Sequence, residues 1–204
     1  MSTTSELPPG QYFGKRWIIY SALSEPVIRA EDWHLKTSGL VEKELDLSFA
    51  DMQKLPQVKF TRTFDCVTKW SIKDVVWEGV AFREIARLTG VKPEAKWVMF
   101  KCADGYTAPV PLEDAMVEDS LIAFKMNERP VPQQQGYPAR PFIPHLYGWK
   151  SAKWLNEIEF LPEYRDGYWE MYGYGERGDV WDEERFKGHM GTHSRRRSLG
   201  TAPI

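Results

Sequence analysis

Cysteine is scarce in this chain of 204 residues, which contains only Cys66 and Cys102. Two thiols are too few for a disulfide framework, a four-cysteine zinc site or an iron–sulfur cluster of the ferredoxin type. A chain of this length buries roughly 70% of its unfolded surface around one core, so it needs no such cross-links. The length corresponds to about one domain.

The sequence also lacks a dominant charge and a long apolar run. Its 27 basic and 29 acidic residues give a formal net charge of −2, so neither nucleic acid nor an anionic membrane surface is an expected partner. No stretch approaches the ~18 apolar residues of a transmembrane helix, and the N-terminus shows no apolar signal for secretion. We therefore expect a cytoplasmic protein with reduced thiols.

Composition divides the chain into three parts. Residues 1–16, with several prolines and glycines, are predicted to form an irregular N-terminal arm. Residues 188–204 lack apolar periodicity and are predicted to form a disordered tail. Residues 17–187 read as one continuous globular domain, in keeping with 42% hydrophobic residues overall and a mean hydropathy of −0.50.

Apolar and polar residues alternate in several short stretches, as they do in half-buried strands. Strands are predicted around residues 33–37, 60–64, 97–100, 121–124 and 158–161. Short helices are predicted over 79–89 with Gly90 as its end, over 111–117, and near 48–54 with Ser48 as a possible N-cap. The segment from Trp70 toward Gly79 is interpreted as a polar connection. Strands outnumber helices without alternating with them, which favours an α+β fold with a mixed sheet.

Common catalytic motifs are absent, including dinucleotide-binding and P-loop glycine patterns, the zinc-protease motif and the hydrolase nucleophile elbow. One unusual stretch is CVTKWS, in which Cys66 closes a predicted strand. A thiol at a strand end can project into a pocket and act as a thiolate. Burial in the core is the commoner fate of a free cysteine, so both interpretations stand.

A second unusual stretch lies between Glu128 and Glu157, where the chain contains no acidic residue. Within it, residues 136–154 are stiffened by three prolines and carry the basic side chains Arg140, His145, Lys150 and Lys153. A rigid, cation-bearing loop without acids is suited to an anionic ligand such as a phosphate. A basic surface loop with solvated lysines explains the pattern equally well.

Four segments in order resemble one known family: CVTKWS, WEGVxxRE, DGYTxPxPLEDA and GxPxRPxxPHLYGWKSAKW. They are similar to the molybdopterin-binding oxidoreductase domain of the sulfite oxidase-like superfamily, which includes the catalytic subunit of bacterial methionine sulfoxide reductase. The likeness runs from about residue 17 to residue 186, and the ending ERGDVWDEERF resembles the short, single-domain prokaryotic branch. The resemblance implies an α+β fold built around a molybdenum–pterin pocket.

The resemblance also implies roles for particular residues. The family's metal-binding cysteine falls on Cys66, and a soft thiolate suits a redox metal that pterin sulfurs already hold. The implied cofactor contacts fall on Tyr20, Ser21, Ala22, Cys102, Gln135, Arg140, Ser151, Ala152 and Lys153.

Two residues beside the cysteine depart from the family pattern. Asp65 and Lys69 stand where the short branch commonly has histidine and glycine. Strand alternation predicts that Asp65 and Cys66 point in opposite directions. The arginine-rich stretch that follows the cysteine in sulfite oxidases is missing, and we expect neither a preceding haem domain nor a following C-terminal sandwich. A sulfite-oxidising role is thereby weakened, and electrons are expected to pass to or from a separate protein.

The resemblance therefore implies an oxidoreductase that carries molybdopterin with molybdenum, or with tungsten. The expected reaction is a two-electron oxygen-atom transfer on a small sulfur-containing substrate or another oxyanion or oxide. One alternative is a non-catalytic module of the same fold that binds an anion or the cofactor. Another is a metal-free enzyme with Cys66 as nucleophile, although no partner base is evident beside it.

Overall fold

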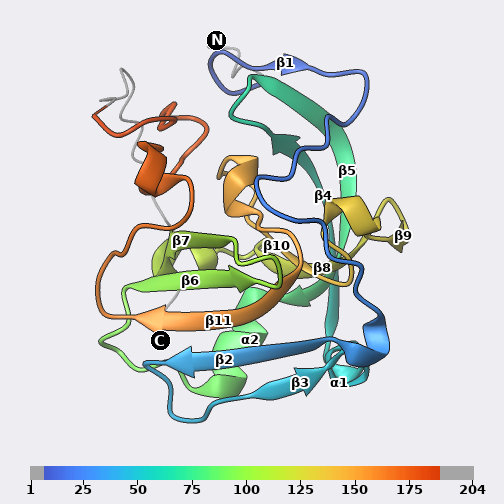
Figure 1. The fold of residues 1–204 in the computed structure, drawn as a ribbon, viewed down its shortest axis with the longest axis vertical. Helices are drawn as coiled ribbons and strands as arrows, with labels where there is room; N and C mark the ends of the chain where they lie inside the picture. Colours follow the sequence, from blue (N-terminus) through green and yellow to red (C-terminus); the bar gives the residue numbers. More distant parts are fainter. Residues whose placement is uncertain (1–6, 189–204) are drawn as a thin grey trace.

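The computed structural model describes residues 7–188 (Figure 1). Its strands are β1 (Tyr12–Phe13), β2 (His34–Gly39), β3 (Asp46–Ser48), β4 (Gln57–Asp65), β5 (Trp70–Ala81), β6 (Trp97–Cys102), β7 (Thr107–Pro111), β8 (Leu121–Met126), β9 (Arg129–Pro130), β10 (Arg140–Phe142) and β11 (Leu155–Leu161). Its α-helices are α1 (Phe49–Lys54), α2 (Phe82–Thr89) and α3 (Leu112–Ala115). Short 3₁₀ turns are η1 (Ala30–Asp32), η2 (Gln133–Gln135), η3 (Gly148–Lys150) and η4 (Glu170–Tyr172). The predicted tail, apart from Gly188, lies outside the described residues.

The strands form two sheets. One has the order β1-β5-β8-β10, with β4 also pairing with β5 and β9 with β8, and the other has the order β3-β2-β11-β6-β7. The β1–β5 and β2–β11 pairs are parallel, whereas β4–β5, β5–β8 and β6–β11 are antiparallel. Mixed sheets with few short helices confirm the predicted α+β class. In Figure 1, α1 and α2 lie at the bottom of the molecule, and the turn between β4 and β5 lies at the top beside β1.

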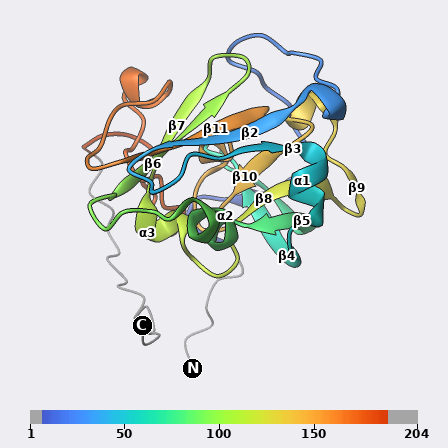
Figure 2. The ribbon, with the colours of Figure 1, turned by 90° about the horizontal axis from the view of Figure 1, so that it is seen from below.

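The helix ends follow from local chemistry. The Ser48 hydroxyl accepts a hydrogen bond from the Asp51 amide, and the Asp51 carboxylate accepts one from the Ser48 amide, so α1 begins with a capping box. Gly90 ends α2 in a left-handed conformation with a φ of 66°. Figure 2 shows both helices from below. Within residues 7–188 no helix has the length and apolar character needed to cross a membrane.

The interpretation of residues 70–79 as a polar connection is wrong, because β5 occupies them. This strand pairs with β1, β4 and β8, and it buries Trp70, Val75 and Trp77. Asp74 has a φ of 55°, an irregularity that breaks the alternation of polar and apolar residues and hides the strand in the sequence. The predicted irregular arm likewise contains β1, which pairs in parallel with the start of β5.

Candidate active site

One cavity gathers most of the residues that the sequence singled out. Its volume is about 420 Å³, and it lies among the β4–β5 turn, the segment around residues 17–22 and the loops that flank β10. It is lined by Trp17, Ile18, Ile19, Tyr20, Ala22, Phe64, Cys66, Val67, Thr68, Trp70, Asp104, Tyr106, Gln134, Gln135, Arg140, Gly148, Trp149, Ser151, Ala152, Lys153, Trp169 and Tyr174.

Cys66 opens the tight turn that joins β4 to β5. Its amide donates to the Trp70 carbonyl at 2.9 Å, and its carbonyl accepts from the Lys69 amide at 3.0 Å. Lys69 has a φ of 77°, a left-handed conformation that favours glycine. The turn brings the Cys66 side chain to the cavity wall, where Sγ lies 3.2 Å from the Thr68 Oγ1 atom.

The neighbouring Asp65 does not line the cavity, as strand alternation predicts. Its side chain is buried, and its carboxylate accepts a hydrogen bond from the Ser71 hydroxyl at 2.5 Å. Burial raises the pKa of this carboxyl. Asp65 therefore belongs to the support of the Cys66 turn rather than to the surface that a ligand would contact.

Arg140 is a buried cation whose hydrogen-bond partners are all neutral. Its guanidinium donates to Ser151 Oγ at 3.0 Å, to the Ser151 carbonyl at 2.6 Å and to the Gln135 carbonyl at 2.9 Å. The residue is only 4% exposed, and no carboxylate within residues 7–188 is seen to form an ion pair with it. Burial lowers its pKa to about 10. A buried guanidinium without a counter-ion is costly, so this geometry favours an anionic ligand.

Lys153 adds a second positive charge to the cavity wall. Its Nζ donates to the Tyr20 carbonyl at 2.8 Å, to Ser21 Oγ at 2.6 Å and to the Gln134 carbonyl at 3.2 Å. Burial, together with the charge of Arg140, lowers the pKa of Lys153 to about 8. These bonds tether the segment around Tyr20 to the opposite loop and so complete one wall of the cavity.

Gln135 supplies an unpaired acceptor. The residue is 7% exposed, and its Oε1 atom has no hydrogen-bond partner among the described residues. The next residue, Gly136, has a φ of 106°, and a Cβ atom there would lie 2.8 Å from the Lys153 Cα, so glycine lets the two loops approach. A buried oxygen of this kind is stabilised when a ligand offers it an N–H group.

A buried ion pair supports the aromatic part of the wall. Glu170 Oε1 accepts from the Trp149 indole at 2.9 Å and from Lys150 Nζ at 2.7 Å, and neither charged side chain is more than 1% exposed. Lys150 also donates to the carbonyls of Pro109 and Glu176. The ion pair therefore holds one edge of Trp149 in place.

The structure brings most of the predicted cofactor contacts together. Tyr20, Ala22, Cys66, Gln135, Arg140, Ser151, Ala152 and Lys153 line the cavity, whereas Ser21 is connected to it through Lys153. Cys102 is different, because it packs in the main hydrophobic core and is absent from the cavity wall. Burial raises the pKa of its thiol well above the usual range. The roles of these residues in cofactor binding stay predictions.

Of the basic side chains Arg140, His145, Lys150 and Lys153, only Arg140 and Lys153 line the cavity. His145 Nε2 lies 2.8 Å from Asp114 Oδ1, and Lys150 pairs with Glu170. Their acidic partners come from segments distant in sequence, so the local absence of acids did not reveal the pairing. Arg140 and Lys153 alone keep the anion-binding role that the loop suggested.

Sequence reasoning did not identify several residues of the cavity wall, and for Trp70, Tyr106 and Trp149 it favoured packing in the core. All three line the cavity. The residues that it missed include Trp17, Thr68, Trp169 and Tyr174. The density of aromatic residues between Tyr164 and Tyr174 was the available signal for the last two.

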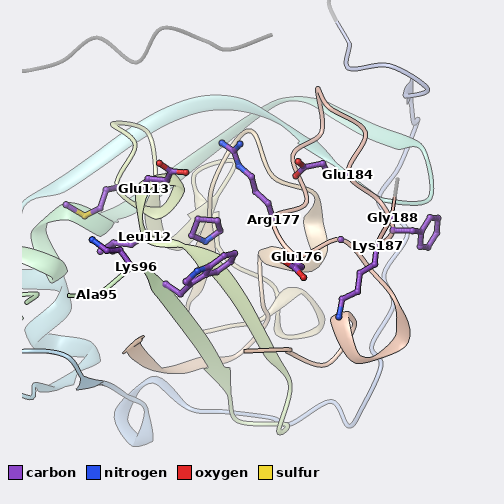
Figure 3. A pocket seen from close by; sticks show the side chains of 14 residues that line it. Ala95, Lys96, Leu112, Glu113, Glu176, Arg177, Glu184, Lys187 and Gly188 are labelled. Atoms are coloured by element: carbon purple, nitrogen blue, oxygen red, sulfur yellow. The ribbon is translucent and has the colours of Figure 1, made fainter. Parts of the chain in front are cut away.

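A second cavity is larger but offers less to a ligand. Its volume is about 910 Å³, and Figure 3 shows the residues around it. Arg177 is already paired with Asp114, and Lys187 with Asp166. No cysteine lines this cavity. We therefore place the candidate site in the smaller cavity, where a thiol meets two cations for which residues 7–188 provide no carboxylate ion pair.

The cavity does not provide a conventional site for a bare metal ion. Residues 7–188 contain no group of three or more histidine, cysteine, aspartate or glutamate side chains that could hold one. A metal at Cys66 must therefore arrive with other ligands of its own. An anionic organic group that carries the metal would match the thiol, the buried cation and the unpaired amide oxygen together.

Comparisons with known proteins agree with this donor set. Residues 22–169 match the family model described as the oxidoreductase molybdopterin binding domain. The chain is 44% identical over 154 residues to the uncharacterized oxidoreductase YuiH of Bacillus subtilis, which covers 76% of this chain and 78% of YuiH. It is 31% identical to the putative protein-methionine-sulfoxide reductase subunit YedZ1 of Azospira oryzae, over 72% of this chain and 56% of that protein.

More distant relatives are considerably longer than the matched region. The mitochondrial sulfite oxidase of Drosophila melanogaster is 29% identical over 74% of this chain but only 31% of its own length. Among solved structures, the sulfane dehydrogenase SoxCD of Paracoccus pantotrophus aligns with a TM-score of 0.65 and 24% identity. That alignment covers 74% of this chain and 43% of the SoxCD chain, and it supports the fold.

Proposed function

Because this chain belongs to the family of oxidoreductase molybdopterin-binding domains, we propose that it catalyses a two-electron oxygen-atom transfer with a molybdenum–molybdopterin group in the smaller cavity. The observation that carries the proposal is Arg140, a buried guanidinium held by neutral groups in the same cavity as the Cys66 thiol. When bound, the group supplies a redox centre at which an oxygen atom is exchanged between water and substrate.

The chain's residues fit such a group by their chemistry. Cys66 would supply a thiolate ligand, which suits a soft redox metal. Arg140 has two N–H groups left after its three hydrogen bonds and would bind the phosphate, with Lys153 adding charge. The unpaired Gln135 oxygen would accept a hydrogen bond from the pterin edge. Molybdenum is our first choice, and tungsten would bind the same ligands.

The charge and polarity of the side chains around Cys66 indicate which class of substrate the cavity would accept. Among residues 7–188, Arg140 and Lys153 are the only lysine or arginine residues that line the cavity, and both are assigned to the cofactor phosphate. The wall otherwise consists largely of apolar and aromatic side chains, including Val67, Trp70 and Trp169. We therefore favour a small neutral oxide, such as a sulfoxide, over an oxyanion such as sulfite, because no further lining cation remains to bind a substrate charge.

A separate electron-transfer protein is part of the proposal. The large hydrophobic side chains that are exposed within residues 7–188 all lie in two segments, residues 12–27 and 171–186. The first contributes Trp17, Ile18, Ile19 and Tyr20 to the cavity wall, and the second contributes Tyr174. Exposed apolar surface at the rim of a site is typical of a docking area for another protein. A cytoplasmic location remains part of the same proposal.

Metal analysis tests the proposed function. The full chain should be produced in a host that makes the molybdenum cofactor, and the folded protein should contain molybdenum or tungsten in near-equal ratio to protein. Reduction of a neutral sulfoxide with a viologen donor should then exceed turnover of sulfite. Folded wild-type protein without either metal would rule out the proposal. Anion binding without turnover, unchanged in a Cys66→Ser variant, would instead favour the non-catalytic alternative. Turnover by metal-free protein that is lost in Cys66→Ser would favour the metal-free thiol enzyme.

Anion binding by the cofactor-free protein should weaken as the pH rises through about 8, the pKa of Lys153. Below that pH Lys153 is protonated and adds its charge to that of Arg140, and above it the ammonium is lost. Losing one charged contact should weaken sulfate binding about tenfold between about pH 6.5 and about pH 9. Sulfate is a suitable probe because its own charge is constant in this range. Calorimetry would measure the change, and Lys153→Arg should remove most of it.

A further inference from the structure

Two side chains from opposite ends of the described chain meet at the Cys66 turn. Gln11 lies just before β1, and Arg185 lies in the C-terminal segment, 174 residues away in sequence. Gln11 Nε2 donates to the Cys66 carbonyl at 3.1 Å and to Ser71 Oγ at 3.1 Å. Arg185 Nη1 donates to the Val67 carbonyl, and its Nη2 donates to Gln11 Oε1 at 3.0 Å. The two side chains thus form one connected support.

Arg185 is the buried half of this support, whereas Gln11 is half-buried. Arg185 is 8% exposed, and its guanidinium carbon lies 4.7 Å from the ring centroid of Tyr147. Hydrogen bonds of a charged donor in such surroundings are stronger than those at the surface. Neither Gln11 nor Arg185 lines the cavity, and both lie outside the residues that the family model matches. They therefore act on the site through the turn and not through contact with a ligand.

The two carbonyl groups that accept these hydrogen bonds determine the orientation of the Cys66 side chain. The Cys66 and Val67 carbonyls belong to the two peptide units that follow Cys66, so fixing them fixes the backbone from which its side chain projects. The turn also contains Lys69 in a left-handed conformation, which is strained for a residue with a side chain. External hydrogen bonds offset that strain and keep the turn in one conformation.

We propose that Gln11 and Arg185 are positioning residues that hold the Cys66 turn in the geometry needed for metal ligation. The inference rests on the proposed role of Cys66 as the metal ligand. Residues that orient a ligand from outside the metal's own contacts commonly affect metal affinity by about 10- to 100-fold. The structure assigns this task to the two ends of the domain.

Hydrogen exchange on the cofactor-free, full-length protein tests the support directly. The reporters are the amides of Cys66 and Lys69, which donate within the turn. Gln11→Met and Arg185→Met should each raise their exchange rates about fivefold, the factor associated with one lost hydrogen bond. Amides of β6 and β11 should keep their wild-type rates. Arg185→Lys retains a charged donor and should give an intermediate effect.

Matched control variants separate this effect from a general loss of stability. Gln57 donates to the carbonyls of Met52 and Leu55, and Arg83 donates to the Met116 carbonyl, and neither residue lines the cavity. Gln57→Met and Arg83→Met should leave the exchange of the Cys66 turn unchanged. Because Gln11 and Arg185 bind each other, the double variant should raise exchange by less than the product of the single effects.

Measuring how long each variant retains its metal then tests whether the conformation of the turn affects binding of the proposed cofactor. In loaded protein, Gln11→Met and Arg185→Met should each speed the loss of molybdenum during dialysis at least threefold, while the two controls should not. Unchanged exchange at Cys66 and Lys69, or an equal increase throughout β6 and β11, would overturn the positioning role. If local exchange rises but wild-type protein never retains a metal, the support stands and the proposed function fails.

Discussion

Replacing Cys66 by alanine is expected to reduce oxygen-atom transfer by about a thousandfold or more, the scale seen when a central catalytic group is removed. In the described part of the chain, the thiol is the only sulfur atom on the cavity wall, so no neighbouring side chain there supplies an equivalent soft ligand. The fold should survive, because Cys66 is only partly buried and the turn is held by backbone hydrogen bonds. Stability should change by less than about 1 kcal/mol.

The measurements are metal content, turnover and thermal unfolding of the same purified sample. Cys102→Ala is the matched variant, because it removes a thiol from the hydrophobic core instead of the cavity wall. It should lower the unfolding temperature while leaving turnover per folded molecule close to the wild-type value. A loss of turnover in Cys102→Ala as large as that in Cys66→Ala would show that Cys102 contributes to the cofactor site. It would contradict the placement of Cys102 in the core and of Cys66 alone at the metal.

Replacing Glu170 by glutamine should have the largest effect on stability. Glu170 is the buried counter-ion of Lys150, and removing one partner of a buried pair commonly costs about 3–5 kcal/mol. For a chain of this size the unfolding temperature should fall by roughly 10 °C. The Trp149 indole would also lose the carboxylate that holds it, so the cavity wall should loosen. Calorimetry and tryptophan fluorescence would record the two changes.

The pH dependence of this variant follows from Lys150. Burial lowers the pKa of Lys150 in the folded protein below its ordinary value, and loss of Glu170 removes the charge that opposes this effect. Between the folded and unfolded pKa values the unfolded chain binds more protons, so stability should rise with pH there. The cost of Glu170→Gln should therefore shrink in alkaline solution. A second change, Lys150→Met, should recover part of the loss, and a constant deficit across pH would contradict this account.

Local signals in the sequence were enough to predict the elements that depend on neighbours in the chain. Ser48 and Gly90 mark helix ends through their own side-chain or backbone chemistry, and both predictions are confirmed. The strand before Cys66 was also found, because it alternates clearly. The strand β5 was not, since Asp74 interrupts its pattern and its stability comes from three neighbouring strands.

The residues of the site divide in the same way, into those that local sequence signals reveal and those that depend on distant contacts. The motif around Arg140 and Lys153 could be recognised as a resemblance, and the structure places both side chains on one cavity. What could not be predicted were pairings between distant segments, such as Lys150 with Glu170 and His145 with Asp114. Sequence spacing carries no information about which acid neutralises which base across a fold. Gln11 and Arg185 escaped notice for the same reason, because each is unremarkable within its own segment.

The long-range contacts at the Cys66 turn have a consequence for biosynthesis. The β4–β5 hairpin is a local structure, but the Arg185 bond to Val67 spans 118 residues and its bond to Gln11 spans 174. Contacts of such separation form late, because loop-closure entropy must first be overcome. A ribosome also releases residue 185 long after the hairpin. The thiol should therefore acquire its final orientation only near the end of synthesis, which leaves an interval in which the turn is loose enough to admit a bulky cofactor.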